Sequence, residues 1–241
     1  MVKKSTENIN TWISQINNEY RTAISVDCVI FGYNDQCLKV LTTPCDMPPF
    51  EGTYSLVGDL LHPDETLTQA AERILHMRTG LTDVVLEQVE AFSGLDRHPL
   101  GRVVTIAYYS LLQLDDSLLK EVVNHANLMW QDVQEVQHLA FDHKEIMDRC
   151  LQSLQSHLRE RPIGFSLLPE QFSLKQIQTL YETVLGVKLD KRNFRRKLKA
   201  LNILIDIGET QEMVSHRPAK LYSFDKDAYK QKRKTGFTFQ L

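Results

Sequence analysis

Apolar runs long enough to cross a bilayer, roughly 20 residues, are missing from this 241-residue chain. The start of the chain, Met1 to Glu7, holds two lysines and lacks the apolar core of a signal peptide. The four cysteines, at positions 28, 37, 45 and 150, show none of the CxxC spacing that is typical of metal sites. We therefore expect a cytoplasmic protein with free thiols, no metal, no cofactor and no membrane partner.

Internal repeats and low-complexity tracts are also absent, and 241 residues are enough for two domains. The net charge of −3 hides an uneven distribution. Residues 186–241 carry 14 Lys/Arg and 6 Asp/Glu, a net of +8, whereas residues 1–185 have a net of −11. A basic module on an acidic body favours a polyanionic partner, and the alternative is a solvated basic surface.

The N-terminal part of the chain shows the apolar spacing of a mixed α and β domain. We expect helices within 5–20, 65–78 and 141–159, and strands within 24–31, 38–43, 83–93 and 103–112. Helices that flank mixed strands on both sides predict an α/β/α sandwich over residues 1–160.

The C-terminal part predicts a winged helix-turn-helix over residues 172–241, so the whole chain belongs to the α+β class. Residues 161–171 contain two prolines and are expected to form a linker. Ser173 is a suitable N-cap for a helix that ends at Leu185, and Asp190 for a second helix that ends at Leu201. Segments 203–207 and 219–224 then form the hairpin of the wing.

The second helix has the residue types of a DNA reader. Phe194, Leu198 and Leu201 point inward by their spacing, which leaves the polar positions to a DNA groove or to solvent. Arginine can bind guanine with two hydrogen bonds, and asparagine can bind adenine in the same way. The candidate DNA-binding residues are Lys191, Arg192, Asn193, Arg195, Arg196 and Lys199, with His216, Arg217 and Lys220 in the wing.

Residues 58–81, called here the box segment, resemble a Nudix box. Glu65 and Arg73 occupy family positions, and a Gly-apolar pair closes the segment. The family's other glutamates hold magnesium over a pyrophosphate, but here their places are taken by Ile74, Met77 and Arg78. None of these three side chains supplies the oxygen ligands that Mg²⁺ needs. We therefore expect no catalytic residue, a structural ion pair or loop-bracing hydrogen bonds for Glu65 and Arg73, and core packing for Met77.

The chain as a whole resembles the Nudix-related transcriptional regulators of the NrtR type. Beside the box segment, the resemblance rests on residues 93–108, 141–143, 189–197 and 217–222. It implies a homodimer that binds a pseudopalindromic operator in double-stranded DNA and releases it when a metabolite enters the Nudix domain. Several members sense ADP-ribose, and an AraR-like branch responds to L-arabinose.

The same residues allow two interpretations, which differ in the effector that they bind. Carboxylates, histidines and an aromatic ring suit the hydroxyl groups of a neutral sugar, and Asp59 stands where a phosphate would approach. Arginines, in contrast, suit the pyrophosphate of ADP-ribose. The sequence favours a pentose, with arabinose first, over an ADP-ribose sensor in the regulation of NAD metabolism. The candidate effector residues are Tyr33, Asp59, His62, Arg78, Asp96, Arg97 and His98. The alternative for each of them is a solvent-exposed loop residue without a role in binding.

Two other classes of function are open. One is an active hydrolase of ADP-ribose or nucleoside diphosphate sugars that holds metal with Glu65, Asp59 and Asp64. A single box glutamate is a poor magnesium site, which disfavours this reading. The other is a scaffold whose Nudix fold only dimerises the protein. Turnover assays and ligand-dependent thermal stability separate these two readings from a sensor.

Overall fold

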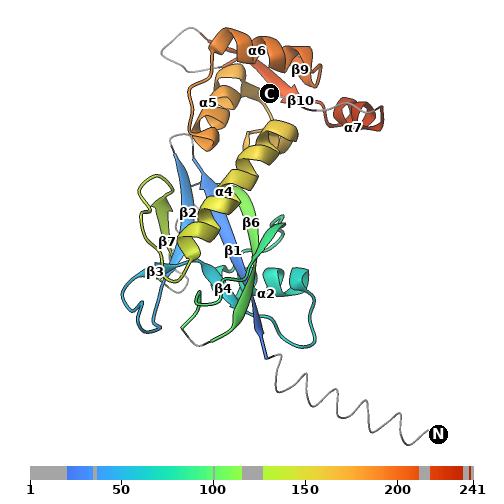
Figure 1. The fold of residues 1–241 in the computed structure, drawn as a ribbon. Helices are drawn as coiled ribbons and strands as arrows, with labels where there is room; N and C mark the ends of the chain where they lie inside the picture. The colour runs from blue at the N-terminus through green and yellow to red at the C-terminus, as the bar shows by residue number, and fades with distance from the viewer. Residues whose placement is uncertain are drawn as a thin grey trace, which may run out of the picture.

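The computed structural model describes residues 21–34, 37–99, 101–115, 127–211, 218–235 and 239. The helix expected within residues 5–20 and the wing residues His216 and Arg217 lie outside these ranges. Within the described part of the chain, none of the helices has the length and apolarity needed to cross a membrane. Figure 1 shows two parts stacked along one axis, with a long helix, α4 (His143–Glu160), running from the lower part to the upper one.

The lower part is built on a mixed sheet in the order β3-β2-β1-β6-β5, with β4 paired to β1 and β7 to β2. Its centre is the parallel pair β1 and β6, in register from Ala23 opposite Val103 to Tyr33 opposite Gln113. The strands are β1 (Ala23–Tyr33), β2 (Leu38–Pro44), β3 (Tyr54–Ser55), β4 (Val57–Leu60), β5 (Glu87–Phe92), β6 (Val103–Gln113) and β7 (Met129–Asp132).

Two helices cover opposite faces of this sheet, α2 (Leu67–Thr79) and α4 (His143–Glu160). Alternate residues of β1 explain the arrangement, because successive side chains of a strand point to opposite faces. Val26, Cys28 and Ile30 pack in the apolar cluster that contains the buried face of α2. Val29, Phe31 and Tyr33 pack in the cluster that contains α4. The predicted α/β/α sandwich is confirmed.

The upper part has the predicted winged helix arrangement. Helices α5 (Leu174–Leu185) and α6 (Lys191–Ala200) precede a small sheet in the order β8-β10-β9. Both predicted N-caps are confirmed: the Ser173 hydroxyl accepts from the backbone N–H of Gln176, and the Asp190 carboxylate accepts from that of Asn193. The remaining elements are a 3-10 helix η1 (Pro162–Leu167), β8 (Phe172–Ser173), β9 (Leu204–Thr210), β10 (Lys220–Phe224) and α7 (Lys226–Lys234). Helix α7 has no counterpart in the sequence prediction.

Residues 161–171, expected as a linker, are packed against both parts of the molecule. Phe165, Leu167 and Leu168 are buried in the cluster that also contains the end of α4 and the core of α5. The ring of Phe165 stacks on Phe224 with 4.4 Å between centroids. The two prolines led to the prediction of a linker. These three apolar residues lie between the prolines, and their burial orders the segment. The domain boundaries at 160 and 172 stay a prediction.

Candidate functional site

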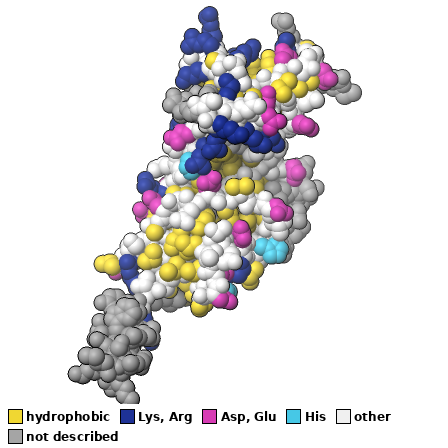
Figure 2. Space-filling view, turned by 90° about the vertical axis from the view of Figure 1, so that its right-hand side faces the viewer, with side chains coloured by type: hydrophobic (Ala, Val, Ile, Leu, Met, Phe, Trp, Pro, Cys, Tyr) yellow, Lys and Arg dark blue, Asp and Glu magenta, His cyan; other side chains and the backbone are white. Residues whose placement is uncertain are grey.

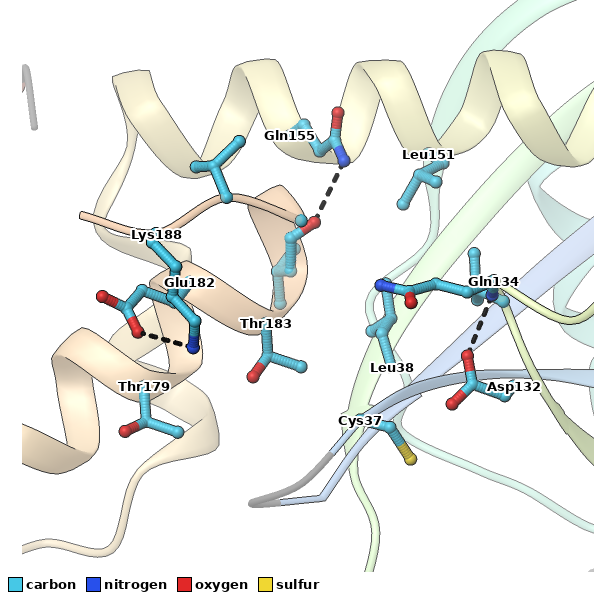
Figure 3. Close-up of a pocket in the computed structure, with 14 residues that line it drawn as sticks. Cys37, Leu38, Asp132, Gln134, Leu151, Gln155, Thr179, Glu182, Thr183 and Lys188 are labelled. Atoms are coloured by element: carbon cyan, nitrogen blue, oxygen red, sulfur yellow. Dashed lines mark hydrogen bonds and ion pairs between the residues drawn. The ribbon is translucent and has the colours of Figure 1, made fainter.

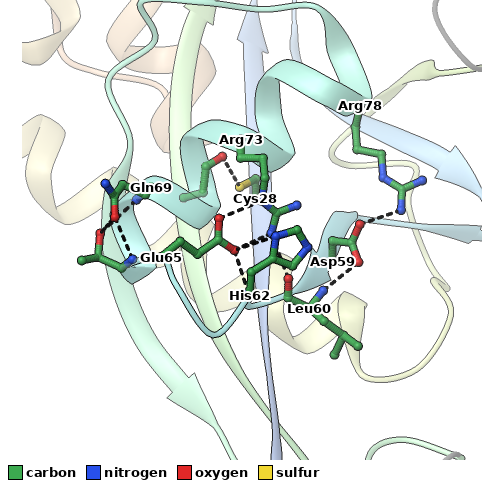
Figure 4. A network of polar contacts seen from close by, with 10 residues as sticks. Cys28, Asp59, Leu60, His62, Glu65, Gln69, Arg73 and Arg78 are labelled. Carbon is green, nitrogen blue, oxygen red and sulfur yellow. Dashed lines mark hydrogen bonds and ion pairs between the residues drawn. The ribbon is translucent and has the colours of Figure 1, made fainter.

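The box segment begins with a tightly bonded loop before α2. Arg73 donates to the Glu65 carboxylate from Nε at 2.8 Å and from Nη2 at 2.6 Å, and Nη2 also donates to the Leu60 carbonyl at 2.9 Å (Figure 4). The backbone N–H of His62 donates to the same carboxylate at 2.8 Å. The hydrogen bond from Arg73 is the main reason why the pKa of Glu65 falls to about 2. The structural role expected for Glu65 and Arg73 is confirmed.

The three replaced box positions differ in their surroundings. Ile74 is 1% exposed against the sheet, whereas the Met77 side chain is in solvent, with 65% of the residue exposed. The prediction that Met77 packs in the core is therefore wrong. The buried stripe of α2 follows Ala70, Ala71, Ile74, Leu75 and Thr79, and at 3.6 residues per turn Met77 falls on its flank.

The residues present do not fit the magnesium that the box would hold in its usual form. The Glu65 oxygens are occupied by Arg73, and Arg78 brings a positive charge to the place of a metal ligand. Among the residues that the structure describes, no group of three or more His, Cys, Asp or Glu side chains is placed to bind a metal ion.

A cavity of about 610 Å³ opens beside the box segment. Four of the predicted effector residues line it, namely Asp59, Arg78, Arg97 and His98. At one end, Arg78 Nη2 on α2 donates to Asp59 Oδ2 on β4 at 3.2 Å, and both side chains are partly exposed (Figure 4). Within the described ranges, the Arg78 guanidinium at this end of the cavity is held by one weak contact.

The other end of the cavity is aromatic and more enclosed. Phe141 stacks face to face on the His98 ring at 5.0 Å and also contacts Phe50 at 4.7 Å. Arg97 is 5% exposed in its side chain and donates twice to the Asp142 carboxylate, at 2.7 and 2.6 Å. Burial, followed by the charge of Arg97, lowers the pKa of His98, which favours a neutral ring here.

A carboxylate and a histidine that the sequence analysis did not select also line this cavity. His143, the first residue of α4, accepts a hydrogen bond at Nδ1 from the Leu56 N–H at 3.0 Å. Its Nε2 therefore carries the proton in the neutral ring and lies 3.4 Å from Asp27 Oδ2. Asp27 was detectable in the sequence as a lone carboxylate within the apolar run Val26–Phe31.

The other three predicted effector residues do not line the cavity. Tyr33 is 1% exposed and packs in the core at the far end of β1. Six residues along a strand, at about 3.3 Å each, place it about 20 Å from Asp27. His62 and Asp96 lie in loops, and both are exposed, His62 beside Glu65. Their selection rested on residue type alone, which does not distinguish a loop that faces the cavity from one that faces solvent.

The predicted DNA-binding residues of α6 form an exposed basic surface. Lys191, Arg192, Asn193, Arg196 and Lys199 are exposed, while the expected inward residues Phe194, Leu198 and Leu201 are buried. Arg195 differs, because it is half-buried and its Nε is enclosed without a hydrogen-bond partner among the described residues. In Figure 2, Lys and Arg side chains gather over the upper part of the molecule.

In the wing, Lys220 is held by a carboxylate. Its Nζ lies 3.0 Å from Asp206 Oδ2, and this hydrogen bond raises the pKa of Lys220. The ammonium group is exposed, so a phosphate can replace Asp206 as its partner at little cost.

A second cavity, of about 570 Å³, lies at the joint between the two parts of the molecule. Figure 3 shows Gln155 of α4 donating across this joint to the Val184 carbonyl of α5, at 3.0 Å. Lys188 and Glu182 form an ion pair at 3.5 Å on the winged helix side. None of the predicted site residues lines this cavity.

Comparison with known proteins assigns both parts of the chain. Residues 164–224 match the family model of the NrtR DNA-binding winged helix domain. The ADPR responsive transcriptional repressor NtrR of Acinetobacter baylyi is 28% identical over 205 residues, covering 83% of this chain and 81% of that protein. The crystal structure of Shewanella oneidensis NrtR complexed with a 27mer DNA is 28% identical with a TM-score of 0.72, covering 90% of this chain and 97% of that chain.

A further relative matches about half of the chain. The ADP-ribose pyrophosphatase of Methanocaldococcus jannaschii is 30% identical over 125 residues, covering 52% of this chain and 70% of that protein. With the sandwich and the winged helix described above, these matches show that the protein belongs to the NrtR-type Nudix-fold transcriptional regulators with a winged helix domain.

Proposed function

We propose that this protein is a DNA-binding transcriptional repressor whose Nudix-fold domain binds ADP-ribose without hydrolysing it. The observation that carries the proposal is the pairing of an exposed basic helix, α6, with a cavity in which Arg78 replaces a metal ligand. The first feature supplies a DNA-binding surface, and the second supplies a site for an anion that does not need magnesium.

The DNA-binding half of the proposal rests on charge and position. The N-terminal turn of α6 holds the exposed residues Lys191, Arg192 and Asn193, and this is the part of the helix that reaches base edges in this kind of domain. The related NrtR from Shewanella oneidensis is described in complex with DNA. We infer the same activity here, with a homodimer on a pseudopalindromic operator in the cytoplasm.

The effector half rests on Arg78. Among the residues that the structure describes, it has one hydrogen bond, to Asp59, which is partly exposed at 3.2 Å. A pyrophosphate can therefore replace Asp59 as the partner of the guanidinium at little cost. The Acinetobacter baylyi relative is described as ADPR responsive. The pentose effector favoured by the sequence receives no support from these relatives. We therefore prefer ADP-ribose, whose sugar rings also account for the polar groups at the other end of the cavity.

A hydrolase is the competing function, since one relative is an ADP-ribose pyrophosphatase. The box side chains argue against it, because an isoleucine, a methionine and an arginine replace the metal ligands. Incubation with ADP-ribose and Mg²⁺, followed by chromatography, distinguishes the two. We expect intact ADP-ribose, and turnover that disappears in Glu65→Gln would reject a pure sensor.

The main test measures DNA binding and its response to ligand together. A duplex selected by the full-length protein from a random library is labelled, and its affinity is followed by fluorescence anisotropy. We expect ADP-ribose, but not L-arabinose or ADP alone at the same concentration, to weaken binding. Tight binding that ignores ADP-ribose and responds to arabinose would restore the pentose reading, and no DNA binding would reject the proposal.

A further inference from the structure

The floor of the effector cavity holds a buried carboxylate that the proposed function does not yet use. Asp27 is 5% exposed, and its Oδ2 accepts no hydrogen bond from any residue that the structure describes. The His143 Nε2 at 3.4 Å is too far for a good hydrogen bond. A buried carboxylate is costly unless donors surround it, so Asp27 is a group prepared for donors from a ligand.

The sequence makes room for this carboxylate. Gly58 lies opposite Asp27 in the β1–β4 pair, and a Cβ at position 58 would overlap Asp27 Oδ1. The φ of Gly58 is not in the left-handed region, so the glycine is needed here for space rather than for backbone conformation. Any side chain at position 58 would displace the carboxylate from its place on the cavity floor.

The neighbours of Asp27 are suited to hydroxyl groups rather than to phosphates. Ser25 and Thr105 lie on the same face of the sheet, with their hydroxyl oxygens 2.5 Å apart, and both line the cavity. Arg97, a buried cation that also lines the cavity, is already neutralised by two short bonds to Asp142. The cavity therefore has an anion-binding end at Arg78 and a hydroxyl-binding end at Asp27.

We propose that Asp27 is the specificity-determining residue of the cavity and accepts hydrogen bonds from the hydroxyls of the ribose that extends beyond the pyrophosphate. A carboxylate accepts from two neighbouring hydroxyls and repels a terminal phosphate, so it distinguishes ADP-ribose from ADP. His143, whose ring is fixed by the Leu56 N–H, lies beside this carboxylate, with its Nε2 at 3.4 Å. This inference rests on the proposed effector class.

The test is a ratio of two affinities, measured by calorimetry on the full chain without Mg²⁺. Wild type should bind ADP-ribose at least about tenfold more tightly than ADP, because a buried acceptor left unpaired by ADP is costly. Asp27→Asn should bring this ratio close to one, mainly by weakening ADP-ribose. The matched control, Asp59→Asn at the Arg78 end, should change both affinities together and keep the ratio.

A change in the ligand keeps the proposal testable if Asp27→Asn fails to fold. Wild type should bind ADP linked to 2-deoxyribose at least about tenfold more weakly than ADP-ribose. An unchanged ratio in folded Asp27→Asn, or equal binding of the deoxy ligand, would overturn the role of Asp27 and leave the effector assignment intact. Wild type that binds neither ADP-ribose nor ADP would instead reject the effector assignment, and this inference with it.

Discussion

At the scale of single residues, the box segment has the residues that shape a Nudix box but lacks the residues that bind its metal. Glu65 and Arg73 are kept and form a bidentate ion pair that closes the loop before α2 onto the Leu60 carbonyl. The metal-binding positions are lost, yet the loop still needs this pair because it sets the path from β4 to α2. The two conserved-looking residues therefore have a structural role.

The stability that comes from Glu65 should depend on pH in a defined window. Its pKa is about 2 in the folded chain and near the ordinary 4.5 when unfolded, so its contribution is complete above about pH 4.5 and disappears as pH falls through about 2. Glu65→Gln should lower the urea midpoint at pH 7, and the difference from wild type should shrink as pH falls from 4.5 towards 2. A difference that stays constant over that range would contradict the assigned ion pair.

Arg78 should determine the affinity for the anionic part of the effector. Hydrogen bonds to charged groups contribute about 1.5–3 kcal/mol, so Arg78→Ala should weaken ADP-ribose binding by roughly tenfold to a hundredfold. Arg149 is a matched control, because it is equally exposed and bonded to a carboxylate, Glu90, away from the cavity. Calorimetry that finds the same loss in Arg149→Ala would indicate a general effect of charge.

The residues that the sequence placed wrongly share one cause. Tyr33 was selected for its aromatic ring and Met77 for its apolar character, but burial depends on where a strand or helix ends relative to its neighbours. Asp27 was missed because its neighbour His143 follows it by more than a hundred positions and lies on α4, in the helical layer that packs on the sheet. The chemistry of each side chain can be predicted from the sequence, but the contacts between residues that are far apart in the chain cannot.

At the scale of helices and strands, local signals were more reliable. Helices α5 and α6 were predictable because Ser173 and Asp190 cap them and their apolar positions recur on one face. Strands β4 and β7 were missed because they are only four residues long and are paired across long separations, such as Thr42 with Met129. Helix α7 was not predicted, because its packing through Tyr229 on Phe224 has no local signal.

The two basic helices of the upper part should contribute differently to DNA binding. Arg192 and Arg196 are exposed on α6, so Arg192→Ala with Arg196→Ala should remove base discrimination as well as affinity. Arg195→Ala is a less clean test, because the partly enclosed Arg195 also packs. The matched control, Lys230→Ala with Arg233→Ala on α7, should weaken every duplex about equally.

Affinity measured against salt concentration, on selected and scrambled duplexes, checks this difference. Each lost phosphate contact should lower the slope of log K against log salt by about 0.9. A loss of discrimination in the α7 variant, or its retention in the α6 variant, would show that the reading helix had been assigned wrongly.

At the scale of the whole molecule, α4 connects the effector cavity with the winged helix domain. Its first residue, His143, lines the cavity, and its last turns pack on η1 and α5. At about 1.5 Å per residue, its 18 residues span about 27 Å. The apolar cluster is continuous from Leu154 and Leu158 to Phe165 and Leu180, so the two parts share one core. These packed side chains provide a physical route by which a displacement at the start of α4 would reach the winged helix domain.

Gly164 lies between α4 and α5 at that joint and provides its test. A Cβ at position 164 would lie 3.0 Å from Leu158 on α4 and 3.0 Å from Leu180 on α5. Gly164→Ala should therefore push the two helices apart slightly, with a cost of about 1–2 kcal/mol in the free energy of unfolding. If α4 couples the two sites, the variant should bind ADP-ribose with wild-type affinity in the absence of DNA, while ADP-ribose releases operator DNA less effectively.

Gly94→Ala is the matched control, since its Cβ would meet only Arg97 at an ordinary 3.7 Å. Operator affinities with and without ADP-ribose give the coupling factor for all three proteins. Equal factors in wild type and Gly164→Ala would show that the effect of the ligand reaches the DNA by another route.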